Sequence, residues 1–341
     1  MRKKVSVIIP CYNGEKTIDR AMDSVYIQDY ENLELIVVDD GSTDGSKEKI
    51  LAWESRFREK HMTIKYVYQK NKGLGGAIST GLSHISGDFL MLLDADDAYL
   101  PGAVSKRIAY FEAHPQCNTV RANGWMERES GKYLFVYEEK EKIATDIFEM
   151  LLRGETNNWA GSYMVRVAPL KNFYKDRIYY PSRYGQNLQI LLPVVYENEC
   201  GFIDEPLMRY IQQENSLSRI DIPEKEKSKI LENTKGYLDI REHLIREIVQ
   251  DPEKQMYYLN STRAAYWRGM LHLGTQYKDH ALAKKALKCI KKYEKTSIDD
   301  RIAYYHLTNP FVSYFYRAVN KIEKVLCRSK HRSTQKKLQN L

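Results

Sequence analysis

Cysteine is scarce and scattered in this chain, which limits the kinds of site that it can form. The five cysteines are odd in number and far apart, and no two of them form a C-x-x-C pair. This pattern argues against a disulfide framework and against a zinc site, and favours a reducing compartment. We therefore expect packed free thiols. They are Cys11, Cys117, Cys200, Cys289 and Cys327.

Long apolar runs are also missing. The best candidate, Leu188–Tyr196, is well short of the roughly 18 apolar residues that a helix needs to span a bilayer. At the start of the chain, Met1–Lys4 leads into only a few apolar residues before Pro10, which is not the pattern of a secretory signal. We expect a soluble protein of the cytoplasm, or one held peripherally on the inner face of the cell membrane.

Two nucleotide-binding motifs are absent from the first half of the chain. Neither G-x-G-x-x-G nor G-x-x-x-x-G-K-[ST] follows the first predicted strand, so neither a dinucleotide cofactor site nor a P-loop is indicated. The net charge of +8 suits a polyanionic partner such as a nucleotide-linked substrate or an anionic lipid. No recognition-helix or aromatic-sheet motif supports binding to nucleic acid, and we expect none.

Apolar runs alternate with helical spacing over the first hundred residues. The run that ends at Asp94 is continuously apolar and bounded by glycine and aspartate, as is typical of a strand covered on both faces. Four strands and three helices at short spacing favour right-handed crossovers and a parallel sheet, which is an α/β fold. The other three predicted strands are Val5–Pro10, Leu33–Val38 and Ile64–Tyr68.

In such a fold, every turn that follows a strand lies at the same edge of the sheet, where open sheets bind ligands. Four polar turns are therefore expected to converge, and together they indicate a nucleotide site. The carboxylates of Asp94–Asp97 repel one another unless a cation offsets them, which points to a divalent metal shared with a phosphate. An ordinary turn that caps a helix is the alternative. The four turns are Pro10–Asn13, Asp39–Ser42, Asn71–Gly76 and Asp94–Asp97.

Three ordered segments resemble the motifs of family 2 glycosyltransferases of the GT-A fold. Val5–Asn13 reads VSVIIPCYN, Leu35–Asp44 reads LIVVDDGSTD and Leu92–Asp97 reads LLDADD. The resemblance covers roughly residues 4–215 and is of the bacterial surface-polysaccharide type. It implies a Rossmann-like GT-A domain and an inverting transferase that uses a nucleotide-diphosphate sugar, with a UDP-sugar as first choice, together with Mn²⁺ or Mg²⁺.

The resemblance also implies roles for individual residues. Tyr12 and its neighbours would frame the base and ribose, and Asp40 would accept a hydrogen bond from the edge of the base. Asp94 would face the ribose, and Asp96 would face the metal-bound diphosphate and hold the metal. The implied nucleotide-binding residues are Pro10, Tyr12, Asn13, Asp40, Gly73, Asp94, Ala95 and Asp96.

The chain departs from the family's pattern where the catalytic base is expected. Gln186 and Asn187 stand where the family commonly shows Glu-Asp, and amides cannot take a proton from an acceptor hydroxyl. We expect these two amides to position the acceptor. Asp97 is our first candidate for the base, with capping of the turn as its alternative role, and Glu155 is our second candidate.

A loop in the middle of the chain resembles the family's acceptor-side loop. Asn158 and Trp159 lie in it, and an aromatic ring beside amides suits stacking on a sugar, although a plain core tryptophan is the alternative. A second departure is Ala77–Ser79, where many relatives show Ala-Arg-Asn after the glycine-rich turn.

From about Ile222 the chain becomes rich in lysine and glutamate with helical spacing, which predicts a helical C-terminal unit. We expect a GT-A domain over residues 1–220, a helical unit over 221–320 and a basic tail over 321–341. The helices could complete the core, mediate assembly or bind substrate. The tail could lie on an anionic membrane surface or be a disordered end.

The resemblance implies a hexosyl- or N-acetylhexosaminyltransferase. The expected acceptor is a hydroxyl of a glycan or of a lipid-linked oligosaccharide in cell-surface polysaccharide synthesis. Two alternatives remain open. One is transfer to polyprenyl phosphate, an anionic acceptor that needs no base. The other is a subunit that binds a nucleotide-sugar or glycan without catalysis.

Overall fold

The computed structural model describes residues 3–129, 131–175, 179–180, 184–212, 223–309 and 312. The chain forms two compact units, residues 1–255 and 256–341, and each is described by itself.

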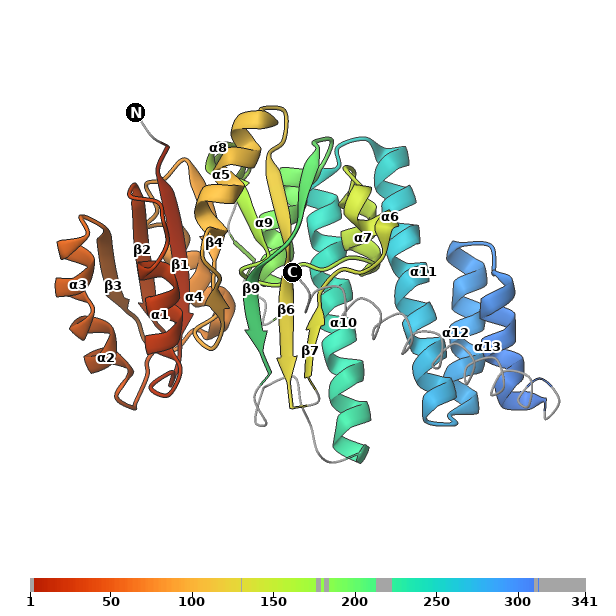
Figure 1. The fold of residues 1–341 in the computed structure, drawn as a ribbon. Coiled ribbons are helices and arrows are strands. Elements are labelled where there is room, and N and C mark those ends of the chain that lie inside the picture. The colour runs from red at the N-terminus through yellow and green to blue at the C-terminus, as the bar shows by residue number, and fades with distance from the viewer. Residues whose placement is uncertain are drawn as a thin grey trace. The chain divides into compact units, whose positions relative to one another are not determined.

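A sheet of nine strands, counted over the described residues, forms the centre of the first unit (Figure 1). The strand order is β3-β2-β1-β4-β8-β6-β9-β5, and β7 pairs with β6. The first four strands in this order run parallel, whereas β8 is antiparallel to β4. The strands are β1 Val5–Cys11, β2 Leu33–Asp39, β3 Thr63–Tyr68, β4 Phe89–Leu92, β5 Ala98–Tyr99, β6 Thr119–Arg128, β7 Gly131–Leu134, β8 Tyr163–Arg166 and β9 Cys200–Ile211.

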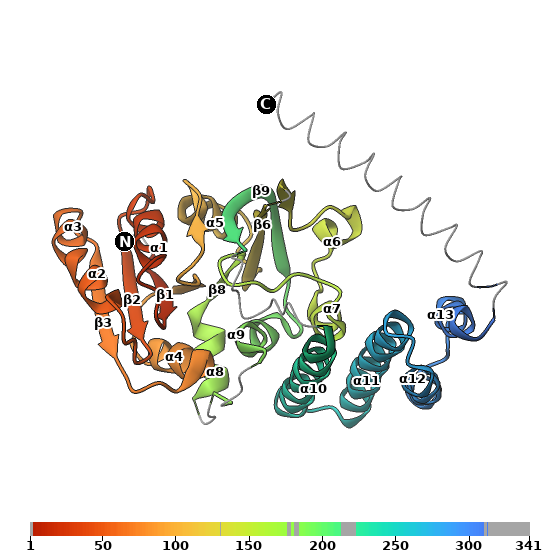
Figure 2. The same cartoon turned by 90° about the horizontal axis from the view of Figure 1, so that it is seen from below.

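Helices cover both faces of this sheet. Figure 2 shows α1, α3 and α5 on one side and α4, α8 and α9 on the other. Strands β1, β2 and β4 are buried along their whole length because both faces of the sheet are covered here, and most of their side chains are apolar. The helices of this unit are α1 Ile18–Tyr26, α2 Ser46–Ala52, α3 Glu54–Glu59, α4 Gly73–Leu82, α5 Ala103–Ala113, α6 Glu139–Ile143, α7 Phe148–Arg153, α8 Val167–Tyr174, α9 Gln186–Val195 and α10 Pro223–Ile248.

The four parallel strands and the α/β class predicted from the sequence are confirmed. Strand β6 also forms an antiparallel pair with β7, in the register Trp125↔Leu134. The sequence pattern missed β8, which is only four residues long and lies between β4 and β6. Between β2 and β3 the chain forms two short helices, α2 and α3, on either side of Trp53.

The two compact units divide after Gln255, beyond the boundary expected at residues 220 and 221. Helix α10 therefore belongs with the sheet rather than with the second unit, because it packs against α9. Most of α11 Pro252–Gln276 lies in the second unit, followed by α12 His280–Tyr293 and α13 Ile298–Thr308. A capping box begins α13, a helix that the sequence analysis did not predict.

Arg268 joins the helices of the second unit. Its guanidinium forms ion pairs with Glu294, at 2.6 Å, and with Asp300, at 3.1 Å. The end of the expected helical unit, residues 313–320, and the basic tail of residues 321–341 lie outside the described residues.

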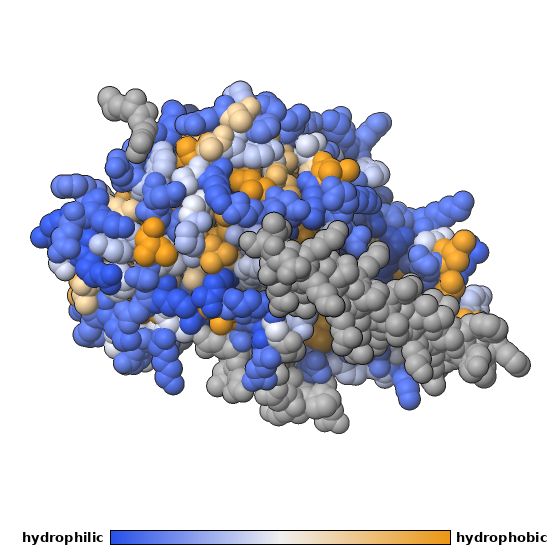
Figure 3. Space-filling view, in the orientation of Figure 1, coloured by the Kyte–Doolittle hydropathy of each residue, from blue (hydrophilic) through white to orange (hydrophobic). Residues whose placement is uncertain are grey.

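Within the described part of the chain, the helices are too short or too polar to cross a bilayer. Figure 3 shows hydrophilic residues over most of one face, with hydrophobic residues in small separate groups.

Candidate active site

The carboxyl ends of β1, β2 and β4 meet at one edge of the sheet, as the sequence predicts. Cys11 is paired with Asp39 in the register of β1 and β2, and the backbone N–H of Leu93 donates to the carbonyl of Ile8 at 3.0 Å. These pairings place the turns that begin at Tyr12, Asp40 and Asp94 side by side. Parallel sheets bind ligands at this edge.

Asn13 ties the first turn to the second. Its backbone N–H donates to the Ser42 hydroxyl at 3.0 Å, and its Oδ1 accepts from the backbone N–H of Thr43 at 2.8 Å. Asn13 adopts a φ of 50°, a left-handed conformation that asparagine tolerates better than most residues. Pro10 is buried within β1, whereas the Tyr12 side chain is 55% exposed. Of these three predicted residues, Tyr12 and Asn13 are exposed to a ligand.

Asp40 is held in one orientation by two donors. Its Oδ1 accepts from Gln69 Nε2 at 2.6 Å and from the backbone N–H of Lys72 at 2.8 Å. Its other oxygen, Oδ2, accepts no hydrogen bond from the residues that the structure describes. The carboxylate thus has a fixed position. Only 3% of the residue is exposed, and Oδ2 is the oxygen that the described protein leaves unused. Gly73, with a φ of 75°, begins α4 directly after this contact.

The Asp94–Asp97 turn crowds three carboxylates together. Burial and the charge of Asp96 raise the pKa of Asp94 to about 7. Burial also raises the pKa of Asp96, although the Arg20 guanidinium opposes this. Arg20 reaches the turn from α1 and donates from Nη2 to the backbone carbonyl of Asp96 at 2.5 Å. The turn is anchored, and its carboxylates lack sufficient counter-charge.

The surroundings of Asp97 argue against its predicted role as catalytic base. The side chain has no exposed surface, and its Oδ1 accepts from the backbone N–H of Ile211 at 3.0 Å, which fixes the turn to the end of β9. Burial raises the pKa of Asp97 to about 9, and the charges of Asp94 and Asp96 add to the shift. A buried carboxyl group bound to the backbone cannot contact an acceptor hydroxyl directly. The alternative structural role therefore fits Asp97 better.

The same turn has the chemistry of a divalent cation site. Asp94 and Asp96 are partly exposed carboxylates. Burial raises the pKa values of both, and the charge of Asp96 adds to the shift of Asp94, so a hard cation would stabilise their charged forms. Over the described residues, no group of three or more histidine, cysteine, aspartate or glutamate side chains is arranged to hold a metal. A cation here would thus take oxygens from a ligand as well as from the protein, as Mg²⁺ does with phosphates.

A cavity of about 560 Å³ lies at the start of α9, and several predicted residues line it. The loop after α7, the first turn of α9 and the middle of α10 form its walls. The structure therefore brings together Gln186, Asn187, Asn158 and Trp159, as well as the second candidate base, Glu155. The lining residues are Phe135, Glu141, Leu151, Gly154, Glu155, Thr156, Asn157, Asn158, Trp159, Gly185, Gln186, Asn187, Thr234, Tyr237 and Arg241.

Tyr163 connects this cavity to the carboxylate turn. Its buried hydroxyl donates to Asn187 Oδ1 at 2.7 Å. Burial raises the pKa of Tyr163, and the charge of Asp94 is one of the nearby charges that add to the shift, as it also is for Tyr237 in the cavity wall. In the sheet, Met164 of β8 pairs with Met91 of β4, so Tyr163 lies beside the end of β4, where the carboxylate turn begins.

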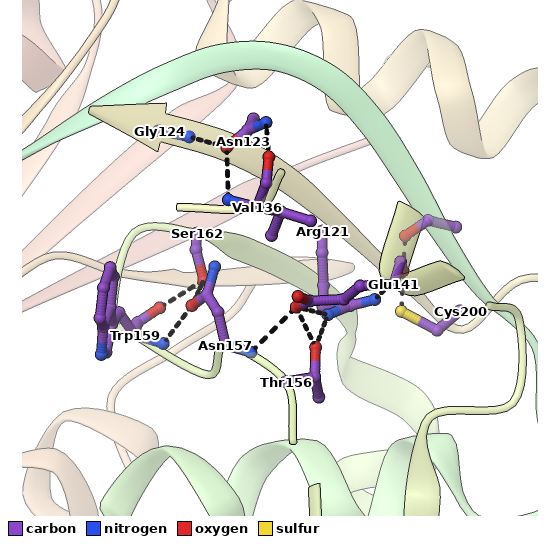
Figure 4. A network of polar contacts seen from close by, with 11 residues as sticks. Arg121, Asn123, Gly124, Val136, Glu141, Thr156, Asn157, Trp159, Ser162 and Cys200 are labelled. Atoms are coloured by element: carbon purple, nitrogen blue, oxygen red, sulfur yellow. Dashed lines mark hydrogen bonds and ion pairs between the residues drawn. The ribbon is translucent and has the colours of Figure 1, made fainter. Parts of the chain in front are cut away.

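Figure 4 shows the polar network that shapes the loop after α7. The buried Arg121 lies 3.5 Å from Glu141 Oε1, which also accepts from the Thr156 hydroxyl and from the backbone N–H of Asn157, the latter at 3.2 Å. Asn157 Oδ1 in turn accepts from the backbone N–H of Trp159 at 2.9 Å. These contacts fix the loop backbone before any ligand binds.

Trp159 is held by rings on two sides. Its ring is stacked on Tyr210, with centroids 5.3 Å apart, and meets Phe135 edge to face at 4.3 Å. The residue is still partly exposed and lines the cavity. Trp159 thus combines core packing with a position on the cavity wall.

Residues 6–173 match the family model described as glycosyl transferase family 2. The chain contains a family 2 glycosyltransferase domain. Its relatives include the glycosyltransferase GlyA of Streptococcus pneumoniae, which is 29% identical over 234 residues, or 64% of this chain and 32% of GlyA. Glycosyltransferase alr2836 of Nostoc is 37% identical over 109 residues, or 32% of this chain and 33% of that protein. The chain thus spans about a third of the length of these relatives.

Solved structures support the GT-A fold predicted for this glycosyltransferase. S. aureus TarS residues 1–349 in complex with UDP-GlcNAc match with a TM-score of 0.60 at 17% identity, over 84% of this chain and 81% of that one. A longer TarS structure matches with a TM-score of 0.57 at 16% identity, over 91% of this chain and 52% of that one. The GT-A-like sheet with a helical C-terminal region is confirmed.

Three residues near the glycosyltransferase site were missed by reasoning from the sequence. Arg20 lies within a helix that showed only apolar periodicity. Tyr237 and Arg241 are one helical turn apart on α10, which we interpreted as part of a separate unit. For Tyr237 and Arg241, the sequence offered one indication of a shared site. They are an aromatic residue and an arginine four positions apart, a spacing that places both side chains on one face of a helix.

Proposed function

We propose that this protein transfers a sugar from a nucleotide-diphosphate sugar, with a UDP-sugar as our first choice, to a hydroxyl of a glycan or lipid-linked glycan acceptor. The observation that carries the proposal is the junction between the carboxylate turn and the cavity. Tyr163 lies on β8 beside the end of β4, where the carboxylate turn begins, and its hydroxyl holds Asn187 at the cavity wall. A donor bound at the sheet edge would therefore present its sugar to a molecule in the cavity.

The donor end suits a nucleotide. Asp40 Oδ2 would accept the imide N–H of uracil, and the exposed Tyr12 ring would stack on the base. TarS, whose fold this chain shares, was solved with UDP-GlcNAc. Asp94 and Asp96 would hold Mn²⁺ or Mg²⁺ together with the diphosphate, and the cation would stabilise the negative charge that develops on the leaving group.

The residues of this chain would then guide the acceptor. Gln186 and Asn187 would orient its hydroxyl toward the anomeric carbon. The oxygen forms the new glycosidic bond on the face opposite the diphosphate, the bond from the anomeric carbon to the diphosphate oxygen breaks, and its electrons leave with the diphosphate. The configuration is inverted because the attack comes from the opposite face.

The hydroxyl proton needs an acceptor, and we propose Glu155 in place of Asp97. Glu155 lines the same cavity as the two amides, and half of its side chain is exposed. Arg153 holds it through an ion pair of 2.7 Å. Glu141 also lines the cavity, but Arg121 and the loop backbone already occupy its Oε1. Glu155 is thus the carboxylate of the cavity that is open to a ligand.

A second candidate function is binding of a nucleotide-sugar without transfer, which the amides at the base position favour. The test is consumption of UDP-sugars by the purified full chain with Mn²⁺ and a panel of glycan acceptors. Release of UDP that depends on the acceptor supports transfer. Tight UDP binding with no acceptor-dependent release supports the binding subunit and contradicts the transferase proposal.

A further inference from the structure

The cavity contains three charged side chains, and they differ in their partners. Glu155 pairs with Arg153, and Glu141 pairs with the buried Arg121. Arg241 has no carboxylate partner among the residues that the structure describes. A cation without an opposite charge is unusual in a partly enclosed site, because removing it from water is costly unless an anion pairs with it.

Arg241 is enclosed as well as unpaired. Its Nε has no exposed surface and no hydrogen-bond partner in the described structure, and its guanidinium lies 5.7 Å from the centre of the Tyr237 ring. A Cβ atom on Gly154 would come within 3.2 Å of Arg241 Nη2, so the absence of a side chain at Gly154 leaves room for the guanidinium. Burial lowers the pKa of Arg241, and the charge of Tyr237 opposes the shift.

Asn157 supplies a second unused donor to the cavity. Its Nδ2 is buried and lacks a partner in the described part of the chain. The orientation of the amide follows from Oδ1, which accepts from the backbone N–H of Trp159 at 2.9 Å, because Nδ2 is a donor and could not make this contact. Both unsatisfied groups in this cavity wall are therefore donors.

We propose that the cavity binds an anionic group of the acceptor, either a phosphate or a carboxylate, through Arg241 and Asn157. This inference rests on the proposed function for the identity of the ligand as an acceptor. A guanidinium binds planar carboxylates and phosphates through parallel hydrogen bonds, and charge-assisted hydrogen bonds of this kind are about twice as strong as neutral ones. The acceptor class is thus an acidic sugar or a phosphate-bearing polyol or lipid.

The experiment measures binding of small probes to the full chain by calorimetry at low ionic strength. The anionic probes are sn-glycerol 3-phosphate and D-glucuronate, and the neutral ones are glycerol and D-glucose. We expect at least one anionic probe to bind about tenfold or more tightly than its neutral counterpart, since a hydrogen bond to a charged group contributes about 1.5–3 kcal/mol. Comparing the affinities for glycerol 3-phosphate and glucuronate shows whether the site prefers a phosphate or a carboxylate.

Two variants test the residues. Arg241→Gln should weaken binding of the anionic probe about tenfold or more. Asn157→Asp keeps the acceptor for the Trp159 N–H but adds a negative charge, and it should also weaken that binding. Arg246→Gln is the matched control, because Arg246 lies on the same helix but pairs with Glu242 on the surface. It should change the affinity by less than about twofold.

UDP titrations of the same proteins separate this inference from the proposed function. UDP affinity should be equal in the wild type, Arg241→Gln and Arg246→Gln. Loss of UDP affinity in Arg241→Gln with unchanged probe binding would place the guanidinium at the donor diphosphate and overturn the inference. Equal binding of charged and neutral probes, or no binding of any probe, would overturn it too. A wild type that binds the anionic probe but not UDP would instead contradict the proposed function alone.

Discussion

The hydroxyl of Tyr163, buried in β8, donates a hydrogen bond of 2.7 Å to Oδ1 of Asn187 at the start of α9. This contact fixes which end of the Asn187 amide faces the protein. The NH₂ end is left for the cavity, so the amide can donate to an acceptor oxygen but cannot remove its proton.

Tyr163→Phe should raise the KM for the acceptor severalfold and leave UDP affinity unchanged. The expected loss is about 0.5–1.5 kcal/mol, the usual net contribution of a neutral hydrogen bond. Steady-state kinetics with a fixed, saturating donor would measure it. Tyr174→Phe is the control, because it removes a hydroxyl that donates to the carbonyl of Gln189 farther along α9. Equal effects of the two variants would show that the Tyr163 contact has no special part in acceptor binding.

Glu155→Gln should lower kcat by about 10² to 10⁴, the usual contribution of a general base. Donor affinity should not change. Asp97→Asn is the comparison: because Asp97 is buried and holds Ile211, we expect lower thermal stability rather than a specific loss of kcat. Single-turnover measurements on both variants separate these effects. Full activity of Glu155→Gln would remove Glu155 from the mechanism.

Asp40→Asn should weaken UDP binding by about 1.5–3 kcal/mol while the fold stays intact. The amide keeps an oxygen for the two donors that hold Oδ1, so the change is confined to the position of Oδ2. Calorimetric titration with UDP measures the loss. Asp23→Asn, on the surface of α1, is the control, since Asp23 pairs with the exposed Arg56. Unchanged affinity in Asp40→Asn would exclude Asp40 from the nucleotide site.

Asp96→Ala should abolish transfer and make UDP binding independent of Mn²⁺. The reason is that Asp96 is a partly exposed carboxylate in a cluster that lacks counter-charge. Thermal shifts with UDP, with and without MnCl₂, test this without an activity assay. Asp19→Ala serves as the control, because Asp19 pairs with Lys49 away from the turn. If Mn²⁺ still enhances UDP binding in Asp96→Ala, the metal assignment is wrong.

Glu34 predicts a pH dependence of stability that is independent of the site. Burial alone would raise its pKa, but hydrogen bonds from Lys4, Ser6 and Ser86 lower it to about 2. Because folding lowers the pKa of Glu34, the ionised side chain stabilises the fold fully at pH values above 4.5, which is its pKa in the unfolded chain. This stabilisation is lost as the pH falls from 4.5 toward 2. The contribution at pH 7 is about 3 kcal/mol. Urea unfolding at pH 7 and pH 3 should show a smaller difference for Glu34→Gln than for the wild type.

The parallel strands and the convergence of their turns could be predicted because both depend on local patterns. The run that leads to Asp94 is apolar throughout, and any strand of this kind in a parallel sheet ends at the ligand edge. The burial of Asp97 could not be predicted in this way. It depends on Ile211, which is 114 residues later in the chain, and no local pattern specifies that contact.

The same reason explains the error at α10. Its lysines and glutamates predicted a helix correctly, but the sequence did not indicate that the helix packs against α9 and adds Arg241 to the cavity. Gln186 and Asn187 were expected to face an acceptor, and the cavity at their position is consistent with that expectation. Their roles in binding remain predictions.

The aromatic contacts of Trp159 have a consequence for the thermodynamics of ligand binding. Because Tyr210 and Phe135 already immobilise the indole, a ligand that stacks on it would restrict few further rotamers. Binding at this wall would then cost little side-chain conformational entropy. A preorganised surface of this kind could hold a sugar that interacts only weakly with it. Enlarging the space around the indole would increase the entropic cost of binding, although every direct contact with the ligand would remain.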